Sequence, residues 1–484
     1  MYESSEPRTS IGRTATMSTI ANTRHAPRSR ALFVTALTLA VVGALASNDA
    51  AASGFQIREN SVKALGRAFA GVDTAGNDAS VVVNNPAAMS DLSGMVFQAD
   101  VTAIGVNTKF HGGGTDLIRQ PLTGGNGGNG GDVTPVPALY FSAPINDAWR
   151  VGVALTAPFG LKTEYDDGWV GRYQALKSKV TSEDITGSVS WNINPQFALG
   201  ASIIAQKTTV DLSNAVDFGG AIAGSYLLQC EGAGAPASYC LSTLPVQPQS
   251  LDGSARVRGD DWSWGWQLGA EFRPTPQDRI GLNYHAKINH TISGNAYFTV
   301  PPMAQALLAL GGEGALFQNT AASGDFATPA SFSASYWHAG SGPVSWGAQL
   351  GWTGWSSFKR LAISYANPAQ PATVQTYNWR DTLFGSLGMD YKVNEQWTLR
   401  GGVAFDQTPT RDSTRDPRIP DGFRRWLAFG VGYAPSANVE FNLGYVHLFV
   451  NNGDVNDTSA TGDNLVGSFD NSANLLGLSG TFHF

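Results

Sequence analysis

The sequence predicts an all-β protein, a transmembrane antiparallel β-barrel of 14 strands that occupies residues 95–484. Three observations lead to this fold class. The 484-residue chain contains 56 glycines, is 11% aromatic and only 14% charged, a composition that favours one repetitive architecture over several soluble domains. From about residue 95 onward, apolar and polar residues alternate with a period of two, which is typical of strands. Short turns also alternate along the chain with much longer loops.

The alternation is clearest in the last predicted strand, where Leu476, Leu478 and Phe484 share one face and polar or small residues occupy the other. Residues 279–288 and 397–406 follow the same pattern. Such strands fit a soluble sandwich as well as a membrane barrel, so the lengths of the loops must decide between these two architectures.

Six short turns separate paired strands, and long connections lie between successive turns. The turns lie near Pro144, Pro195, Pro274, Gly340, Asn394 and Pro435. Short turns at one end and long loops at the other are typical of outer-membrane barrels. If both ends of the barrel domain lie on the side of the short turns, six turns imply seven hairpins and therefore 14 strands.

Three tryptophans support the membrane assignment. Trp262, Trp264 and Trp266 fall on one face of a predicted strand. We expect them at a strand end, in the aromatic girdle at the membrane interface.

Residues 1–52 are predicted to be a signal peptide. Arginines precede the apolar run of residues 31–46, and small alanines follow it, as in secretory signals. The run is shorter than the roughly 20 residues that a membrane-spanning helix needs, so export is favoured over an N-terminal anchor. Either Met1 or Met17 starts the chain.

The composition and motifs disfavour several functions. The net charge of −7 and the lack of a long Lys/Arg cluster argue against nucleic-acid binding. The chain contains no Gly-x-Ser-x-Gly motif for a lipase, and its seven histidines lack metal-ligand spacing. The sequence therefore predicts no enzyme, no metal site and no cofactor.

Two cysteines, Cys230 and Cys240, lie in a predicted loop. Since an exported protein meets an oxidising compartment, we expect a local disulfide. Two free thiols remain the alternative, because spacing alone does not show that the side chains meet.

Two loop segments, residues 214–229 and 303–317, are apolar although loops should face water. They can pack on each other over the barrel mouth, or they can form a docking surface for an apolar solute. A third long loop, residues 111–132, is rich in glycine and lacks the strand-to-helix context of a phosphate-binding loop.

The N-terminal segment carries a resemblance to a known family. Its residues read "GFQIRENSVKALGRAFAG" and then "NDASVVVNNPAAM", which includes an Asn-Pro-Ala motif at Asn85, Pro86 and Ala87. This segment resembles the hatch of the long-chain fatty-acid transporter (FadL) family of outer-membrane proteins. The resemblance continues through "APFGLKTEYDDGWVGRY", "GWTGWSSF" and "WTLRGGVAFDQTP" to Phe484. It implies a 14-stranded barrel with residues 53–94 folded inside the lumen as a plug, or hatch.

The resemblance also implies a function and a location in the bacterial outer membrane, as a multi-pass protein. Members of the family take up hydrophobic molecules passively, typically long-chain fatty acids and in some cases aromatic hydrocarbons. The expected partners are these small molecules, outer-membrane lipid and lipopolysaccharide, and the barrel assembly machinery. A general porin and a structural or adhesive surface protein are the rival interpretations.

Ligand-binding residues follow from the resemblance as Arg380, Lys207 and Phe55. Arg380 shares a face with polar residues of the next predicted strand, the expected lumen side, although an ion pair with Asp381 or with an acid of the plug is an equal alternative. Lys207 has the parity of apolar Phe197 and would face lipid unless a bulge intervenes.

Two further roles follow from the resemblance. Asn85, Pro86 and Ala87 are expected to gate transport by biasing the arrangement of the hatch, or else only to keep it folded. A lateral gap is expected at the third strand, where Gly152 lacks a side chain and Pro158 lacks a backbone donor.

The signal-peptide interpretation makes a direct prediction. Intact-mass analysis of the protein extracted from outer membranes should show a chain that begins near Ser53, because the small residues before it suit cleavage. A mass that retains residues 31–46 would contradict this expectation.

Overall fold

The computed structural model describes residues 54–75 and 78–484. The predicted signal peptide and Ser53 lie outside the described residues.

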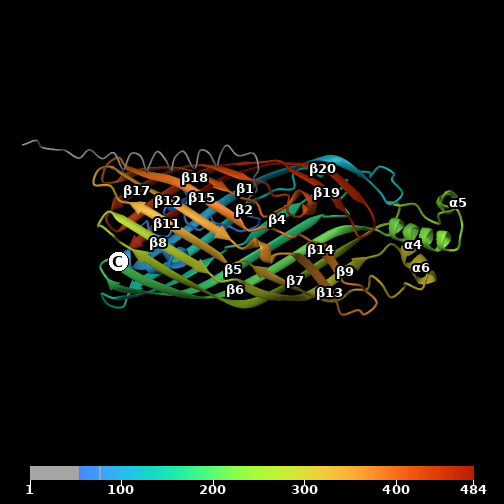
Figure 1. The fold of residues 1–484 in the computed structure, drawn as a ribbon, viewed down its shortest axis with the longest axis horizontal. Coiled ribbons are helices and arrows are strands. Elements are labelled where there is room, and N and C mark those ends of the chain that lie inside the picture. Colours follow the sequence, from blue (N-terminus) through green and yellow to red (C-terminus); the bar gives the residue numbers. More distant parts are fainter. Residues whose placement is uncertain (1–53, 76–77) are drawn as a thin grey trace, which may run out of the picture. The chain divides into compact units, whose positions relative to one another are not determined.

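A single closed sheet accounts for most of the described chain (Figure 1). Its first half comprises β1 (Val96–Thr115), β2 (Val133–Pro144), β3 (Trp149–Thr156), β4 (Gly160–Glu164), β5 (Lys177–Asn194), β6 (Phe197–Asp217), β7 (Asp252–Phe272), β8 (Asp278–His285), β9 (Ile288–Thr299) and β10 (Thr320–Thr328). Its second half comprises β11 (Ser331–His338), β12 (Val344–Thr353), β13 (Arg360–Tyr365), β14 (Thr373–Thr376), β15 (Thr382–Lys392), β16 (Trp397–Asp406), β17 (Arg424–Ser436), β18 (Val439–Val450), β19 (Gly453–Thr458) and β20 (Asn464–His483).

The prediction of 14 antiparallel strands is confirmed within the described residues. Six barrel strands are interrupted, and each consists of two consecutive segments: β3 with β4, β8 with β9, β10 with β11, β12 with β13, β14 with β15, and β18 with β19. The barrel closes where β1 pairs with β20, from Val96 opposite His483 to Thr115 opposite Asn464.

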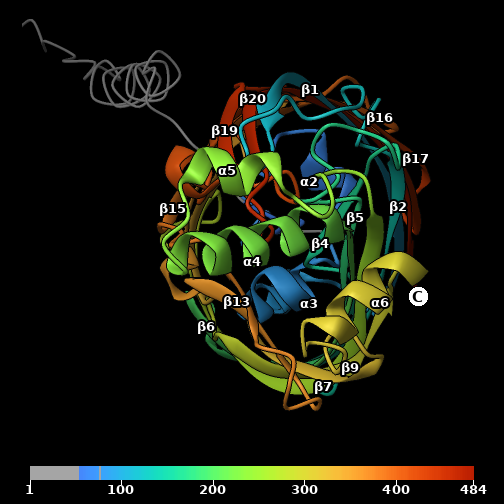
Figure 2. The same ribbon diagram turned by 90° about the vertical axis from the view of Figure 1, so that its right-hand side faces the viewer.

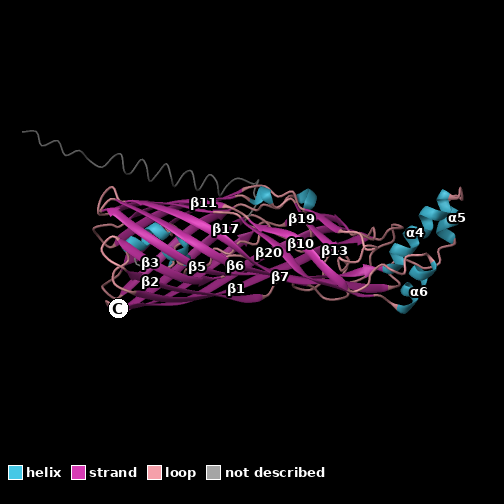
Figure 3. Ribbon diagram, turned by 90° about the horizontal axis from the view of Figure 1, so that it is seen from below, coloured by secondary structure: helices cyan, strands magenta, loops and turns pink. Residues whose placement is uncertain are grey.

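The six short turns are also confirmed. They join β2 to β3, β5 to β6, β7 to β8, β11 to β12, β15 to β16, and β17 to β18. The C-terminus lies at the same end of the barrel as these turns, and the helices α4 (Phe218–Gly232), α5 (Ala237–Ser242) and α6 (Pro302–Leu310) lie at the opposite end (Figures 1 and 3).

Burial alternates along the strands in the sense that a membrane barrel requires. On β3, Trp149, Val151, Val153 and Leu155 are exposed on the outer face, whereas Arg150 points inward and is buried. Other inward-facing residues are polar, as the serines and threonines of β5 illustrate. An apolar exterior around a polar interior reverses the order of a soluble protein and fits a bilayer.

The expected position of the tryptophan girdle was wrong in one respect. Trp262, Trp264 and Trp266 do lie on the outer face of β7, but in the middle of the strand rather than at its end. The reason is that β7 continues to Asp252 and remains paired with β6 and β9 beyond the apolar band.

The hatch lies inside the ring of strands (Figure 2). It comprises α2 (Val62–Leu65), α3 (Val81–Asn84) and the 3-10 helix η1 (Pro86–Asp91). Helix α2 packs on β17, β18 and β20, and η1 packs on β5, β6 and β7. Two further 3-10 turns, η2 (Trp355–Ser357) and η3 (Asp412–Thr414), lie in loops. No helix in the described part of the chain is long and apolar enough to cross a membrane.

The last residue completes the barrel seam, which generates a prediction. The backbone N–H of Phe484 donates to Met95 O at 2.9 Å, and the Met95 N–H donates to Phe484 O at 3.2 Å. Deleting Phe484 should lower the yield of assembled barrel, because it removes this pair and an aromatic residue at the membrane interface. Heat-modifiable gel migration of membrane extracts measures the yield. A Phe484→Tyr control retains both features, and an unchanged yield for the deletion would refute a role in assembly.

Candidate functional site

The Asn-Pro-Ala motif begins η1 and rests directly on the barrel wall. Asn85 accepts a hydrogen bond from Ala87 N at 3.2 Å, which caps the helix. The Asn85 amide donates to Asp73 O at 2.9 Å and to Ala270 O at 3.1 Å. Asn85 therefore joins two parts of the hatch to β7.

Glycines of the barrel make this close approach possible. A Cβ atom built on Gly200 of β6 would lie 2.3 Å from Ala87 N, and one on Gly269 of β7 would lie 2.1 Å from Asn85 Oδ1. Contacts this short do not occur, so both positions require glycine while η1 stays in place. The role of these two glycines was not predicted. A glycine in a strand sequence does not reveal whether a segment far away in the sequence packs on it.

Charged groups anchor the rest of the hatch. Asp91 accepts a hydrogen bond from Arg279 Nε and forms an ion pair with Arg273 at 2.8 Å. Lys63 of α2 forms an ion pair with Glu440 at 2.8 Å, and Arg400 contacts the same carboxylate at 3.1 Å.

Phe55, at the start of the described hatch, lies in an aromatic cluster beneath the extracellular loops. Its ring centroid is 4.7 Å from that of Trp355 and 5.7 Å from those of Phe326 and Trp379. Only 3% of Phe55 is exposed. Its neighbour Gly54 donates from its backbone N to Asp421 at 2.9 Å.

A narrow apolar cavity, the upper pocket, lies against Phe55. Its walls include Val180, Val210, Ile292 and Phe358. An apolar enclosure of this kind suits a hydrophobic chain or ring.

Arg418 is a cation of the upper pocket that sequence reasoning missed, and Arg258 also belongs to the lining. The Arg418 guanidinium donates to Ser178 Oγ at 3.2 Å and to Asn214 Oδ1 at 3.1 Å, and no ion pair of the described residues includes it. Burial raises the pKa of the neighbouring Asp416 carboxyl, and the Arg418 charge opposes that shift. The position of Arg418 depends on how its loop folds over β5 and β6, so no sequence pattern indicates it.

The structure places neither predicted cation in the upper pocket. Arg380 precedes β15, is exposed, and donates from Nε to Thr408 O at 3.3 Å. Asp381 instead accepts from Ser356 N at 2.8 Å. Lys207 lies on the outer face of β6 with its Nζ atom 3.8 Å from Asp260, as its parity indicated, because β6 has no bulge at this position.

The third barrel strand is interrupted, and the wall opens beside the interruption. Pairing between β2 and β3 begins at Pro144 opposite Arg150 and ends at Leu139 opposite Leu155. Above that point, residues 133–138 of β2 pair only with β1, and β4 pairs only with β5. Two strand edges therefore face each other without ladder hydrogen bonds.

The hatch supplies backbone partners at this break. The Ile57 N–H donates to Pro158 O at 2.7 Å, and the Gly160 N–H donates to Phe55 O at 2.9 Å. Pro158 thus lies in the break itself. Gly152 lies lower, in the paired part of β3, where a Cβ atom would be 2.7 Å from Met89 and from Val82 of the hatch.

A second cavity, the gap cavity, occupies about 450 Å³ between these edges and the hatch. It is lined by residues 54–57 of the hatch, residues 133–136 of β2, and residues 157 and 159–163 of the third strand. Phe55 lines both this cavity and the upper pocket, together with Leu161, Val180 and Ile419, so these four residues form the wall between them. A third cavity of about 140 Å³, the lower cavity, lies deeper and includes Asp73, Asp184 and Arg58 in its lining.

The apolar loop segments fold as α4 and α6. Phe218, Ala304 and Leu308 pack together with Val216 in one buried cluster, while Leu228 and other apolar side chains remain exposed. Both features expected of these segments are therefore present: mutual packing and exposed apolar surface.

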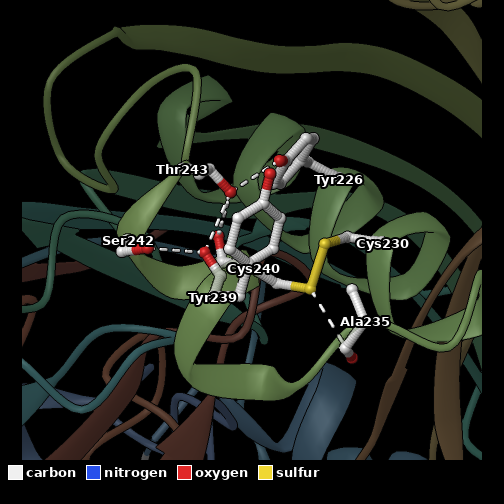
Figure 4. Close-up of a disulfide and its surroundings, with 7 residues drawn as sticks. All are labelled: Tyr226, Cys230, Ala235, Tyr239, Cys240, Ser242 and Thr243. Atoms are coloured by element: carbon white, nitrogen blue, oxygen red, sulfur yellow. Dashed lines mark hydrogen bonds between the residues drawn. A yellow bond between two sulfur atoms is a disulfide. The ribbon is translucent and has the colours of Figure 1, made fainter.

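A disulfide joins α4 to α5 (Figure 4). Cys230 and Cys240 are bonded, and Tyr226 and Thr243 share a hydrogen bond of 2.8 Å beside them. These two links hold the short helix α5 against α4.

Comparison with known proteins agrees with this architecture. The family model described as outer membrane protein transport protein (OMPP1/FadL/TodX) matches residues 43–484. A long-chain fatty acid transport protein of Escherichia coli O6:H1 is 27% identical over 430 residues, which cover 87% of this chain and 92% of the relative.

Solved structures are similar over the same extent. The crystal structure of a Pseudomonas aeruginosa FadL homologue is 30% identical with a TM-score of 0.82, and the match covers 89% of this chain and 100% of that one. The Pseudomonas putida toluene transporter TodX has a TM-score of 0.62 at 18% identity, with 89% of this chain and 100% of that one covered, a likeness of fold alone.

A closed barrel with an apolar exterior and a plugged lumen defines the class as a multi-pass outer-membrane transport protein. Within this class, the chain belongs to the OMPP1/FadL/TodX family, whose members transport hydrophobic molecules across the outer membrane.

The two barrel glycines that contact η1, Gly200 and Gly269, generate a prediction. Gly200→Ala should displace η1 at a cost of about 1–3 kcal/mol, because the new methyl group meets backbone atoms of Pro86 and Ala87. Hydrogen exchange of residues 78–94 should speed up while the barrel keeps its heat-resistant migration. In Gly187→Ala the new Cβ meets nothing within 4 Å, so this variant is the control. Equal exchange rates in the two variants would contradict the assignment.

Proposed function

We propose that this protein takes up long-chain fatty acids passively and releases them sideways into the outer membrane. The observation that carries the proposal is an apolar pocket that contains Arg418, a cation outside every ion pair of the described residues, and that shares a wall with the opening in the barrel. Phe55 belongs to this shared wall. The names of relatives, which include long-chain fatty acid transport proteins, support the same substrate class.

The upper pocket has the chemistry that a fatty acid needs. Its aliphatic and aromatic walls remove an acyl chain from water, which contributes about 0.8 kcal/mol per buried methylene. A carboxylate needs a cationic partner, and Arg418 is held by neutral oxygens only. A ligand carboxylate therefore need not break an ion pair of Arg418, although the charge of Arg418 also acts on Asp416 and Asp457.

Release requires Phe55 to move. Because Phe55 and residues 56–57 line the gap cavity and bond to the broken third strand, a shift of this short segment would join the two cavities. We infer that the Asn85, Pro86 and Ala87 motif influences this shift by fixing η1 on the barrel wall, so that the hatch has more than one accessible arrangement.

An aromatic-hydrocarbon channel is the second candidate, and the mainly apolar lining of the upper pocket favours it equally. A hydrocarbon, however, makes no use of Arg418. A general porin fits less well, because the hatch and its ion pairs occupy the lumen, and large, steady ion currents in single-channel recordings would be needed to support it.

Arg418→Met separates the two substrate classes. Loss of a charge-assisted hydrogen bond costs about 1.5–3 kcal/mol, so fatty-acid affinity should fall roughly 10- to 100-fold while affinity for a neutral long-chain alcohol stays the same. Fluorescence titration of the detergent-solubilised protein measures both. The control Arg411→Met removes an exposed arginine of the same loop. It should change neither the affinity for the fatty acid nor the affinity for the alcohol.

Two results would count against the proposal. Unchanged fatty-acid affinity in Arg418→Met would remove the carboxylate site. Tight toluene binding by the wild type, together with no fatty-acid binding, would assign the pocket to aromatic hydrocarbons.

A further inference from the structure

The outer surface of β4–β7 carries two rows of cations, here called the basic rows. These four segments are neighbours in the barrel (Figure 1). In the first row, Lys162 lies opposite Lys179, Lys179 opposite Asp211, and Asp211 opposite Arg258. In the second row, Lys177 lies opposite Ser213, and Ser213 opposite Arg256.

The basic rows lie above the lipid-facing band. Ile185, Ala205 and Trp264 lie opposite one another on β5, β6 and β7 and form the last fully apolar row of the outer face. Lys179 precedes Ile185 by six residues on β5, which is about 20 Å along the strand and about 15 Å in height at a tilt of roughly 40°. At this height the surface faces the head-group and saccharide layer of the outer leaflet rather than its acyl chains.

Two of the five cations form no ion pair, although both lie opposite Asp211. Lys177 forms an ion pair with Glu164 at 3.0 Å, Arg256 with Asp211 at 2.6 Å, and Lys162 with Asp132. Lys179 and Arg258 are exposed and belong to no ion pair or side-chain hydrogen bond of the described residues. Within the basic rows and their ion-pair partners, five cations thus face three acids. The outer face directly below adds Lys207, Glu183 and Asp260, so six cations stand against five acids and the excess of positive charge lies in the basic rows.

We propose that the basic rows bind the phosphorylated core saccharide of the outer-leaflet glycolipid, with its phosphates on Lys179 and Arg258. These residues flank Asp211 two strands apart, a spacing of about 10 Å. Phosphate oxygens accept charge-assisted hydrogen bonds from both residue types. In the outer membrane, the part of the barrel just above the lipid-facing band is in constant contact with an anionic saccharide layer.

The position of the basic rows beside the opening adds a consequence. Lys162 and Lys179 also line the gap cavity, so a bound head group would stand at the edge of the lateral opening. The glycolipid would then occupy the wall next to the gap, and its acyl chains would border the route by which an apolar solute enters the membrane.

The test measures binding of a purified rough-type glycolipid with a phosphorylated core, and of the same glycolipid after removal of its phosphates. Native mass spectrometry of the detergent-solubilised full-length mature protein counts bound molecules. Each of Lys179→Gln and Arg258→Gln should lower the affinity about fivefold and the double variant about 30-fold. The wild type should bind the dephosphorylated glycolipid as weakly as the double variant binds the intact one, and high salt should abolish the difference.

Lys392→Gln is the matched control, since it removes one exposed cation from the end of β15, beside a short turn at the opposite end of the barrel, and should leave binding unchanged. Heat-resistant migration verifies that every variant is folded. Equal affinity for both glycolipids would mean adsorption through acyl chains only, and an equal loss in Lys392→Gln would mean a general charge effect. Inorganic phosphate binding without variant-sensitive glycolipid binding would indicate a free-phosphate site. Each of these three results would overturn the proposal, and none depends on fatty-acid uptake.

Discussion

Every backbone N–H and C=O group at membrane depth must find a partner within the protein, because hydrocarbon offers none. Pairing of β1 with β20 meets this requirement by closing the sheet along the whole length of β1. Above Leu139 and Leu155 the ladder between β2 and the third strand stops, and there the sequence also removes donors, with Pro135 and Pro137 in β2. At the same place the hatch bonds to Pro158 and Gly160, so an opening exists with few unsatisfied groups.

The same constraint separates rigid from movable parts. Opening the barrel elsewhere would leave rows of backbone groups in lipid, whereas the hatch lies in a polar lumen and is held largely by side-chain contacts such as those of Asn85 and Asp91. A neutral hydrogen bond contributes about 0.5–1.5 kcal/mol net, since water can replace the lost partner. The glycines beneath η1 allow a close fit without adding bonds. Rearrangement is therefore far less costly in the hatch than in the wall.

The barrel could be predicted well because the features that define it can be read from short stretches of sequence. Period-two alternation identifies strands and faces, and turn lengths count the hairpins, so the strand number and the outward orientation of Lys207 followed directly. The tryptophans of β7 were misplaced because alternation does not reveal where a strand leaves the membrane. Gly200 and Arg418 could not be found at all, because their roles depend on which distant segment covers them. The boundaries of the signal peptide stay predictions.

The contrast between the cavities bears on the direction of release. A route along the barrel axis leads into the lower cavity, whose lining includes Asp73, Asp184 and Arg58, where an apolar solute would displace water from polar groups and gain no compensating hydrogen bond. Such a route must also disturb the ion pairs of Lys63 and Asp91. The proposed lateral route displaces residues 54–57, which are held by backbone bonds to the third strand and by Gly54 N to Asp421. It leaves the ion pairs of Lys63 and Asp91 in place, and it leads past Leu161, Val180 and Ile419, the apolar residues that line both the upper pocket and the gap cavity.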